Sequence, residues 1–339
     1  MSGNNSRKSG ITSLMGFGLT AGCFMGVMGL SQAAQATLIH EYSFNAGSTS
    51  SGTYTTPDSV GGAAYQATIM GTGSISNGQV VLTNNNVTSG AAGNAYVSLP
   101  VSALPTTSPT VSFEEWFTAS YDFQTGTSGS VYAQNRGFDF NGDTLATATD
   151  AIATGGGATA PAYLYDSLDR GNGGPGGTGI SPSGYGSEVG VYPGYGAGNH
   201  GLSSYWLTQP GPTGAPVTHM IAVVIDQTPT TSDPYGSISY YVDGYSMGTT
   251  PLTATTQWTV VSPNFTNAWL GRSAFSGDGM LNGTIDEFRI YNNALSSSQV
   301  SADAAAGPNT VLTPEPASLA LFGVAGASLL LIRRRRAAV

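Results

Sequence analysis

Acidic side chains are the residues of this chain whose type and spacing could do chemistry. Hydrolysis of a glycosidic bond needs two carboxyl groups about 5–9 Å apart on either side of a cleft. Glu114 and Glu115 are neighbours in a segment expected to be a strand, and neighbouring side chains of a strand point to opposite faces. Asp286 and Glu287 have the same relation. Neither pair can straddle one bond, so we expect the chain not to be an enzyme.

Other catalytic patterns are equally weak. Residues 244–248 read G-x-S-x-G, but a nucleophile elbow needs a strand before the serine and a helix after it, whereas this serine follows an expected hairpin turn. The three histidines, His40, His200 and His219, are too few and too scattered for a catalytic triad or a zinc site. We expect His219 to pack at the start of a strand.

The segment 139–150 has acidic and amide residues at the first, third, fifth and twelfth positions, as in an EF-hand loop. Thr144 stands where such a loop needs glycine, and Asp150 stands where it needs a bidentate glutamate. We therefore interpret the segment mainly as a turn.

The elements that must position all these residues are β-strands. Apolar segments are short and separated by Gly, Ser, Thr, Asn and Pro, which is typical of a β-sandwich or barrel. Asp243-Gly244 favours a type I′ hairpin turn, and 296–307 predicts a short closing helix. The expected strands are LIHEYSF (38–44), GQVVLT (78–83), AYVSLP (95–100), TVSFEEWFTASYDF (110–123), HMIAVVID (219–226), NAWLGR (267–272) and GTIDEFRIY (283–291).

Charge excludes several classes of partner. Of 339 residues only 9% are charged, and the segment 37–313 has four arginines and no lysine against 18 of the 19 acidic residues. Such a surface repels nucleic acid and anionic lipid. It suits an exported protein, and we expect no nucleic-acid partner.

The N-terminus predicts an export signal. Arg7 and Lys8 precede an apolar stretch, and Ala34-Gln35-Ala36 is a small-x-small cleavage site. We expect signal peptidase to remove 1–36; the alternative is a retained membrane anchor. The single cysteine, Cys23, would leave with the signal, so the mature protein would have no disulfide.

The C-terminal segment 311–339 has three parts: Pro314-Glu315-Pro316, an apolar run at 317–332, and Arg333, Arg334, Arg335 and Arg336. As a helix the apolar run would be about 24 Å long, short for a hydrocarbon core of about 30 Å, and the arginines would stay cytoplasmic. A plain C-terminal anchor is the alternative. The order of the three parts resembles a PEP-CTERM sorting signal. That resemblance implies processing by an exosortase, transient anchoring in the inner membrane, and delivery to the surface of a Gram-negative-type bacterium that makes exopolysaccharide.

The body, from Glu41 to about Gly307, resembles a LamG-like (laminin G or concanavalin A-like) jelly roll. PDSVGG, SFEEWF, THMIAVVID, YYVDGYSMG and WLGRSAFSGDGMLNGTIDEFRIYNNALSSSQV carry this likeness. It implies an all-β sandwich, here a single domain at 37–310. The apolar run at 317–332 is expected to follow this domain as a short transmembrane helix.

The same resemblance implies a structural calcium ion. In this fold class the first and last strands often lie side by side and bind calcium, which would make Asp58 and Asp286 ligands. The alternatives are hydrogen bonds from backbone amides, or a pair with Arg272 or Arg289.

A glycine-rich insertion occupies about 140–215, and it holds 16 glycines between 155 and 201. We expect long loops with occasional strands there. Tyr192, Tyr195, Tyr205 and Trp206 are candidates for stacking on sugar rings. Alternatively, these aromatics hold the loops against the sandwich.

Together these patterns predict an exported cell-surface or matrix protein with a non-catalytic binding module whose partner is a polysaccharide or surface glycan. One alternative is a divergent glycoside hydrolase or lyase on the same fold. The other is a purely structural surface protein.

Overall fold

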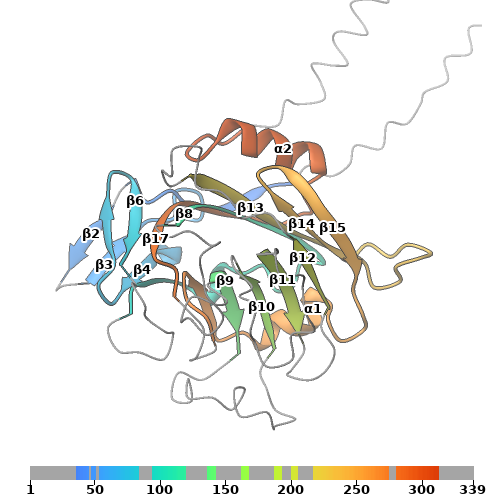
Figure 1. Cartoon of the computed structure of the whole chain (residues 1–339). Coiled ribbons are helices and arrows are strands. Elements are labelled where there is room, and N and C mark those ends of the chain that lie inside the picture. The colour runs from blue at the N-terminus through green and yellow to red at the C-terminus, as the bar shows by residue number, and fades with distance from the viewer. Residues whose placement is uncertain are drawn as a thin grey trace, which may run out of the picture. The chain divides into compact units, whose positions relative to one another are not determined.

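The computed structural model describes residues 36–45, 47–50, 53–83, 94–119, 136–142, 162–167, 187–192, 200–204, 217–274 and 280–312. All of them belong to the compact unit that begins at Ala34. Their strands form two antiparallel sheets (Figure 1). This arrangement agrees with the expected β-sandwich.

The first sheet has β8 and β13 near its middle. Its order is β15 (Tyr245–Pro251), β14 (Ser237–Val242), β13 (Thr218–Asp226), β8 (Thr110–Ala119), β17 (Gly283–Tyr291), β6 (Gln79–Leu82) and β5 (Ser74–Ser76), with β1 (Leu38–Tyr42) paired to the far end of β17.

The second sheet contains the strands of the glycine-rich segment at one end. Its order is β12 (His200–Ser204), β11 (Ser187–Tyr192), β10 (Tyr163–Ser167), β9 (Arg136–Asn141), β16 (Asn267–Leu270), β7 (Tyr96–Leu99), β4 (Ala67–Met70), β3 (Thr53–Thr56) and β2 (Ser48–Ser50). The occasional strands expected in the insertion are therefore present. The interpretation of 139–150 as a turn is wrong at its start, because β9 continues to Asn141.

The core lies between the sheets. Val111, Phe113 and Phe117 of β8 enter it on alternate positions, as the sequence predicts. The ring of Phe113 lies 5.1 Å from that of Phe140 in the second sheet. Strand β8 is nevertheless buried on both faces, because Trp116 joins a second apolar cluster on the outer side of the first sheet with Val300 of α2 (Ser297–Ala306).

Local signals fixed the turn and the closing helix. Asp243 and Gly244 have φ values of 51° and 80°, as a type I′ turn requires. Helix α2 begins at a capping box in which the Ser296 hydroxyl accepts from the Gln299 amide, and the Gln299 side chain accepts from the amide of Ser296. The one-turn helix α1 (Trp258–Val261) was not expected. In the described part of the chain, no helix combines the length and apolarity needed to cross a bilayer.

Candidate functional site

The outer face of the second sheet combines aromatic rings with polar groups. Core residues of β7, β9, β10 and β16 point inward, so the residues between them point outward. Register places the outward positions of neighbouring strands side by side. We call this surface the aromatic face; it comprises Thr68, Tyr96, Ser98, Arg136, Asp139, Asn141, Tyr163, Tyr165, Asn267, Trp269 and Arg272.

Two arginines lie against rings of the aromatic face. The guanidinium carbon of Arg272 is 4.5 Å from the ring centres of both Tyr96 and Trp269, which are 5.9 Å apart in an edge arrangement. Arg136 lies 3.9 Å above the ring of Tyr165. Such cation–π contacts attract each guanidinium to the rings beside it.

A row of hydrogen bonds fixes the polar part of the aromatic face. The Asn267 amide donates to Asn141 Oδ1 at 2.9 Å, and the Asn141 amide donates to Asp139 Oδ1 at 3.0 Å. The backbone amide of Ala274 donates to Asp139 Oδ2 at 2.9 Å. These groups therefore keep one orientation, which is a requirement for selective recognition.

Exposure divides the aromatic face into two zones. Tyr163 and Tyr165 are only 3% and 6% exposed and stack on each other with ring centres 5.8 Å apart, so they pack against protein. Thr68, Ser98 and Arg272 are partly exposed. A ligand on this face would meet the hydroxyl groups of β4 and β7 and the edge of Arg272.

Glu114 and Glu115 point to opposite faces, as predicted. Glu114 accepts a hydrogen bond of 2.9 Å from the Tyr291 hydroxyl on the outer side. Glu115 points into the sandwich, where a Cβ atom on Gly137 would be 2.5 Å from its carboxylate and 2.9 Å from that of Asp166 in β10. Burial, then the charge of Asp166, raises the pKa of Glu115 well above its usual value.

Sequence reasoning missed the Glu115–Asp166 pair, because the two residues come from different sheets and no local pattern links them. Both carboxyl groups have no exposed surface. The pair lies inside the sandwich and not in an open cleft, so this structure gives substrate no access to it.

The strand pairing on which the calcium prediction rests is present, since β1 pairs with β17. Asp58, however, already has several partners. Its Oδ1 accepts from the backbone amides of Glu41, Val60 and Gly61 at 2.7–3.0 Å, and its Oδ2 contacts the His40 ring. Burial alone would raise the pKa of Asp58, but these hydrogen bonds hold it below its usual value. This geometry favours the backbone-amide alternative for Asp58.

Asp286 is displaced by a bulge. The register of β17 shifts between Ile285 and Glu287, so Asp286 does not alternate regularly with the core residue Phe288, as strand periodicity would predict. Its Oδ1 accepts from the Gln79 side chain, and its Oδ2 has no partner among the described residues. The described residues contain no group of three or more His, Cys, Asp or Glu that could hold a metal ion. Calcium binding therefore stays a prediction.

A buried charge cluster on the outer side of the first sheet was also not anticipated. Arg289 donates two hydrogen bonds of 2.9 Å to Glu287 and lies 3.8 Å from Glu114 and 4.0 Å from Asp303 of α2. Three carboxyl groups thus share one guanidinium. Burial is the main cause that raises the pKa of all three, that of Glu287 to about 7.

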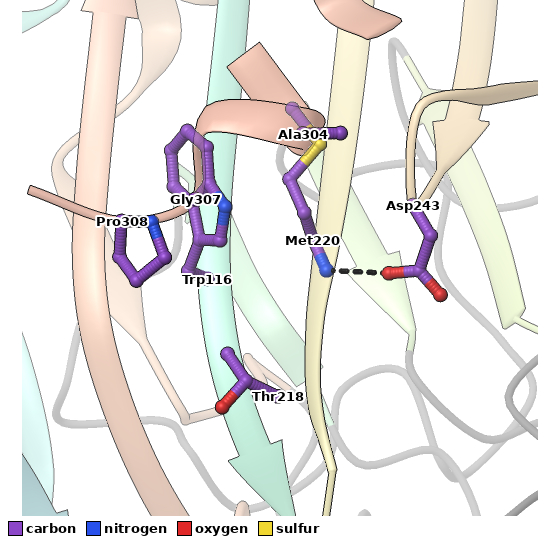
Figure 2. A pocket seen from close by; sticks show the side chains of 7 residues that line it. All are labelled: Trp116, Thr218, Met220, Asp243, Ala304, Gly307 and Pro308. Atoms are coloured by element: carbon purple, nitrogen blue, oxygen red, sulfur yellow. Dashed lines mark hydrogen bonds between the residues drawn. The ribbon is translucent and has the colours of Figure 1, made fainter. Parts of the chain in front are cut away.

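A pocket opens beside this cluster, under the end of α2 (Figure 2). Its volume is about 160 Å³. Trp116 of β8 forms one wall, and Met220 of the adjacent strand β13 stands across from it. The pocket is lined by Trp116, Thr218, Met220, Asp243, Ala304, Gly307 and Pro308.

Several predicted site residues lie outside the described part. Tyr192 pairs with Tyr163 at the end of β11, but its side chain is not among those described. Ala36, at the predicted signal cleavage site, is 7% exposed. The predicted site residues that lie wholly outside the described ranges are Ala34, Tyr195, Tyr205, Trp206, Pro314, Glu315, Pro316 and Arg333 to Arg336.

Residues 177–301 match the family model of the concanavalin A-like lectin/glucanases superfamily, the laminin G-like class. This stretch is similar to LamG-like domains. It includes strands β11 to β17 and the start of α2, and it contains the segment 269–300, the longest of those that carry the resemblance. A search of curated proteins gave no match.

Solved structures show distant likenesses. Domain 4 of AbnA, a GH43 extracellular arabinanase from Geobacillus stearothermophilus, in complex with arabinotriose, has a TM-score of 0.46 and 17% identity over 79% of this chain and 98% of that chain. The Ruminococcus gnavus IT-sialidase CBM40 bound to α2,6 sialyllactose has a TM-score of 0.42 and 12% identity over 66% and 94%. The binding domain of botulinum neurotoxin serotype D/C has a TM-score of 0.46 and 9% identity over 78% and 51%. These likenesses are too distant to carry an argument about function.

Proposed function

We propose that this chain is an exported, non-catalytic glycan-binding module, with an exopolysaccharide or surface glycan as its ligand. The observation that carries the proposal is the aromatic face on a fold whose residues 177–301 match the concanavalin A-like lectin/glucanases superfamily. The partly exposed hydroxyl groups of Thr68 and Ser98 and the guanidinium of Arg272 can hydrogen-bond sugar hydroxyls. The rings of Tyr96 and Trp269, which are 8% and 4% exposed, support Arg272 from below. The partly exposed zone around Arg272 would make the first contacts.

Binding to a panel of immobilised bacterial polysaccharides tests this proposal. We expect the purified protein to bind at least one of them, and Arg272→Met to weaken that binding at least about tenfold, since it removes every donor of the guanidinium. Trp206→Ala tests the predicted contribution of the glycine-rich segment. Tyr245→Ala is the matched control, because Tyr245 is 73% exposed and lies on the first sheet. If no glycan in the panel is retained, the proposal is wrong.

The alternative, a divergent glycoside hydrolase, would have to use the Glu115–Asp166 pair, to which substrate has no access in this structure. A carboxyl group with a raised pKa can serve as a general acid. Our proposal predicts that the purified protein releases no reducing ends when it is incubated with the polysaccharide that it binds. If the wild type releases reducing ends and Glu115→Gln does not, the protein is a hydrolase and not a binding module.

We also propose that the chain reaches the cell surface through signal peptidase and an exosortase. The basis is the sequence of its two ends, including the arginines at 333–336. Mass spectrometry of the secreted protein should find Thr37 as the first residue and a C-terminus near Pro314. Replacement of the four arginines by glutamine should leave unprocessed protein in the cell. An unprocessed chain in the medium would contradict this route.

A further inference from the structure

The pocket beside Trp116 lies on the first sheet, on the other side of the core from the aromatic face. Its volume of about 160 Å³ is comparable with an apolar cavity of about 150 Å³ in another protein that accepts benzene. The space is therefore sufficient for one six-membered ring. Because the pocket is open at the end of α2, a larger ligand could insert a single ring and extend into solvent.

The wall of the pocket contains a hydrogen-bond donor without a partner. Trp116 is 2% exposed, and its Nε1 has no hydrogen-bond partner in the part of the chain that the structure describes. A buried indole N–H normally finds an acceptor. A ligand in this pocket could supply that acceptor as a ring or hydroxyl oxygen.

The other polar groups that line the pocket are suited to hydroxyl groups. Asp243 accepts from the Met220 amide and contacts the His219 ring, both at 2.9 Å. Its side chain is still 44% exposed, and a carboxylate has about four acceptor sites. The Thr218 hydroxyl lies 2.8 Å from that of Thr118 and retains capacity for a further bond. The pocket thus offers one donor, Trp116, and acceptors on the β13 side.

The charges around the pocket select a neutral ligand. The carboxylate of Asp243 and the C-terminal end of α2, which carries a partial negative charge, both disfavour an anion. A cation gains no contact with the indole ring, because the Arg289 guanidinium already lies 4.4 Å from it, and Asp243 already accepts from the Met220 amide and contacts the His219 ring.

We propose that the Trp116 pocket binds a single neutral, hydroxylated ring, such as one uncharged sugar residue. Binding there would be separate from binding at the aromatic face. One molecule could then hold two glycan segments on opposite sides of its sandwich.

The indole N–H signals of the protein test this inference. The chain has four tryptophans, and Trp116→Phe identifies the signal of Trp116 in a ¹H–¹⁵N spectrum. We expect a panel of neutral methyl glycosides to contain at least one that shifts this signal saturably. Equal concentrations of glucuronate or glucosamine should leave it in place. Ala304→Leu, which fills the pocket, should abolish the shift, whereas Ala305→Leu, at an exposed position of the same helix, should preserve it.

Three results would overturn the inference: no response of the Trp116 signal to any neutral glycoside, an equal response in Ala304→Leu, or a larger response to the charged sugars. If Ala304→Leu does not fold, Thr218→Val provides a second pocket variant at an exposed position and should weaken the response at least threefold. Polysaccharide binding through the aromatic face is measured separately with Arg272→Met, so failure here leaves the proposed function standing.

Discussion

Asp58 shows how one residue can join two segments of this fold. It accepts amides from its own turn, at Val60 and Gly61, and from Glu41 in β1. It also contacts the ring of His40. These contacts hold the turn against the first strand. Because Asp58 is only 2% exposed, losing its hydrogen bonds would leave buried donors without partners.

Replacing Asp58 with alanine should lower the free energy of unfolding by about 3 kcal/mol, since several buried donors lose their acceptor at once. Urea denaturation at pH 7 measures the loss. Asp58→Asn keeps an oxygen for the amides and should cost less than half as much. Equal stability of the wild type and the alanine variant would contradict this account.

At the scale of elements, α2 covers part of the outer side of the first sheet and supplies residues to the charge cluster and the pocket there. It covers Trp116 with Val300, brings Asp303 to Arg289, and ends where Ala304 and Gly307 line the pocket. The segment after it is held by the bond from the Asn309 amide to Glu287 at 2.6 Å and by the bond from Arg289 to the Thr310 carbonyl at 3.1 Å. Helix, segment and cluster form one unit.

The capping box of α2 gives a direct test of this unit. Ser296→Ala removes the acceptor of the Gln299 amide and should lower the free energy of unfolding by about 1 kcal/mol. Ser297→Ala, at the exposed next position, is the matched control and should be neutral. If the two variants have the same melting temperature, the cap does not stabilise the fold.

For the molecule as a whole, buried carboxyl groups set the response to pH. Burial raises the pKa of Glu114, Glu115, Asp286, Glu287 and Asp303. A carboxyl with a raised pKa binds its proton more tightly in the folded state, so stability falls as pH rises from the unfolded pKa to the folded one. Asp58 has the opposite sign: its contribution is present above its usual pKa of 3.8 and is lost as pH falls through its lowered value.

The protein should therefore be most stable at mildly acidic pH. Urea midpoints should fall between pH 5 and pH 8, since Glu287 titrates at about 7 in the folded state. Glu287→Gln, which cannot ionise, should reduce the fall. A urea midpoint that rises steadily from pH 5 to pH 8 would show that ionising the buried carboxyl groups does not destabilise the folded state.

Calcium is also a question for the whole molecule, because its predicted ligands come from distant parts of the chain, Asp58 from the turn that contacts β1 and Asp286 from β17. Bound calcium would stabilise the folded state by mass action, so EDTA should lower the melting temperature and added calcium should restore it. Asp286→Asn should remove this response, because Asp286 Oδ2 is the predicted ligand atom without a partner among the described residues. A melting temperature unchanged by EDTA would eliminate the calcium site.

The sequence by itself determined the elements whose signals are local. Alternating apolar residues fixed the strand faces, including the opposite directions of Glu114 and Glu115, because the side-chain period of a strand is two. Asp243-Gly244 fixed a hairpin, and Ser296 with Gln299 fixed the start of α2. The predictions for the two chain ends rest on local order as well, and nearly all of the residues that carry them lie outside the described part.

Only the tertiary structure decided which side chains meet. Glu115 faces Asp166 across the core at Gly137, and Trp116 forms a pocket with residues of α2 and β13. The bulge that displaces Asp286 follows from pairing with β8 and has no signal of its own in the sequence. The physical reason is that strand order and helix placement are set by burying a shared core, and many sequences satisfy the same local pattern with different partners.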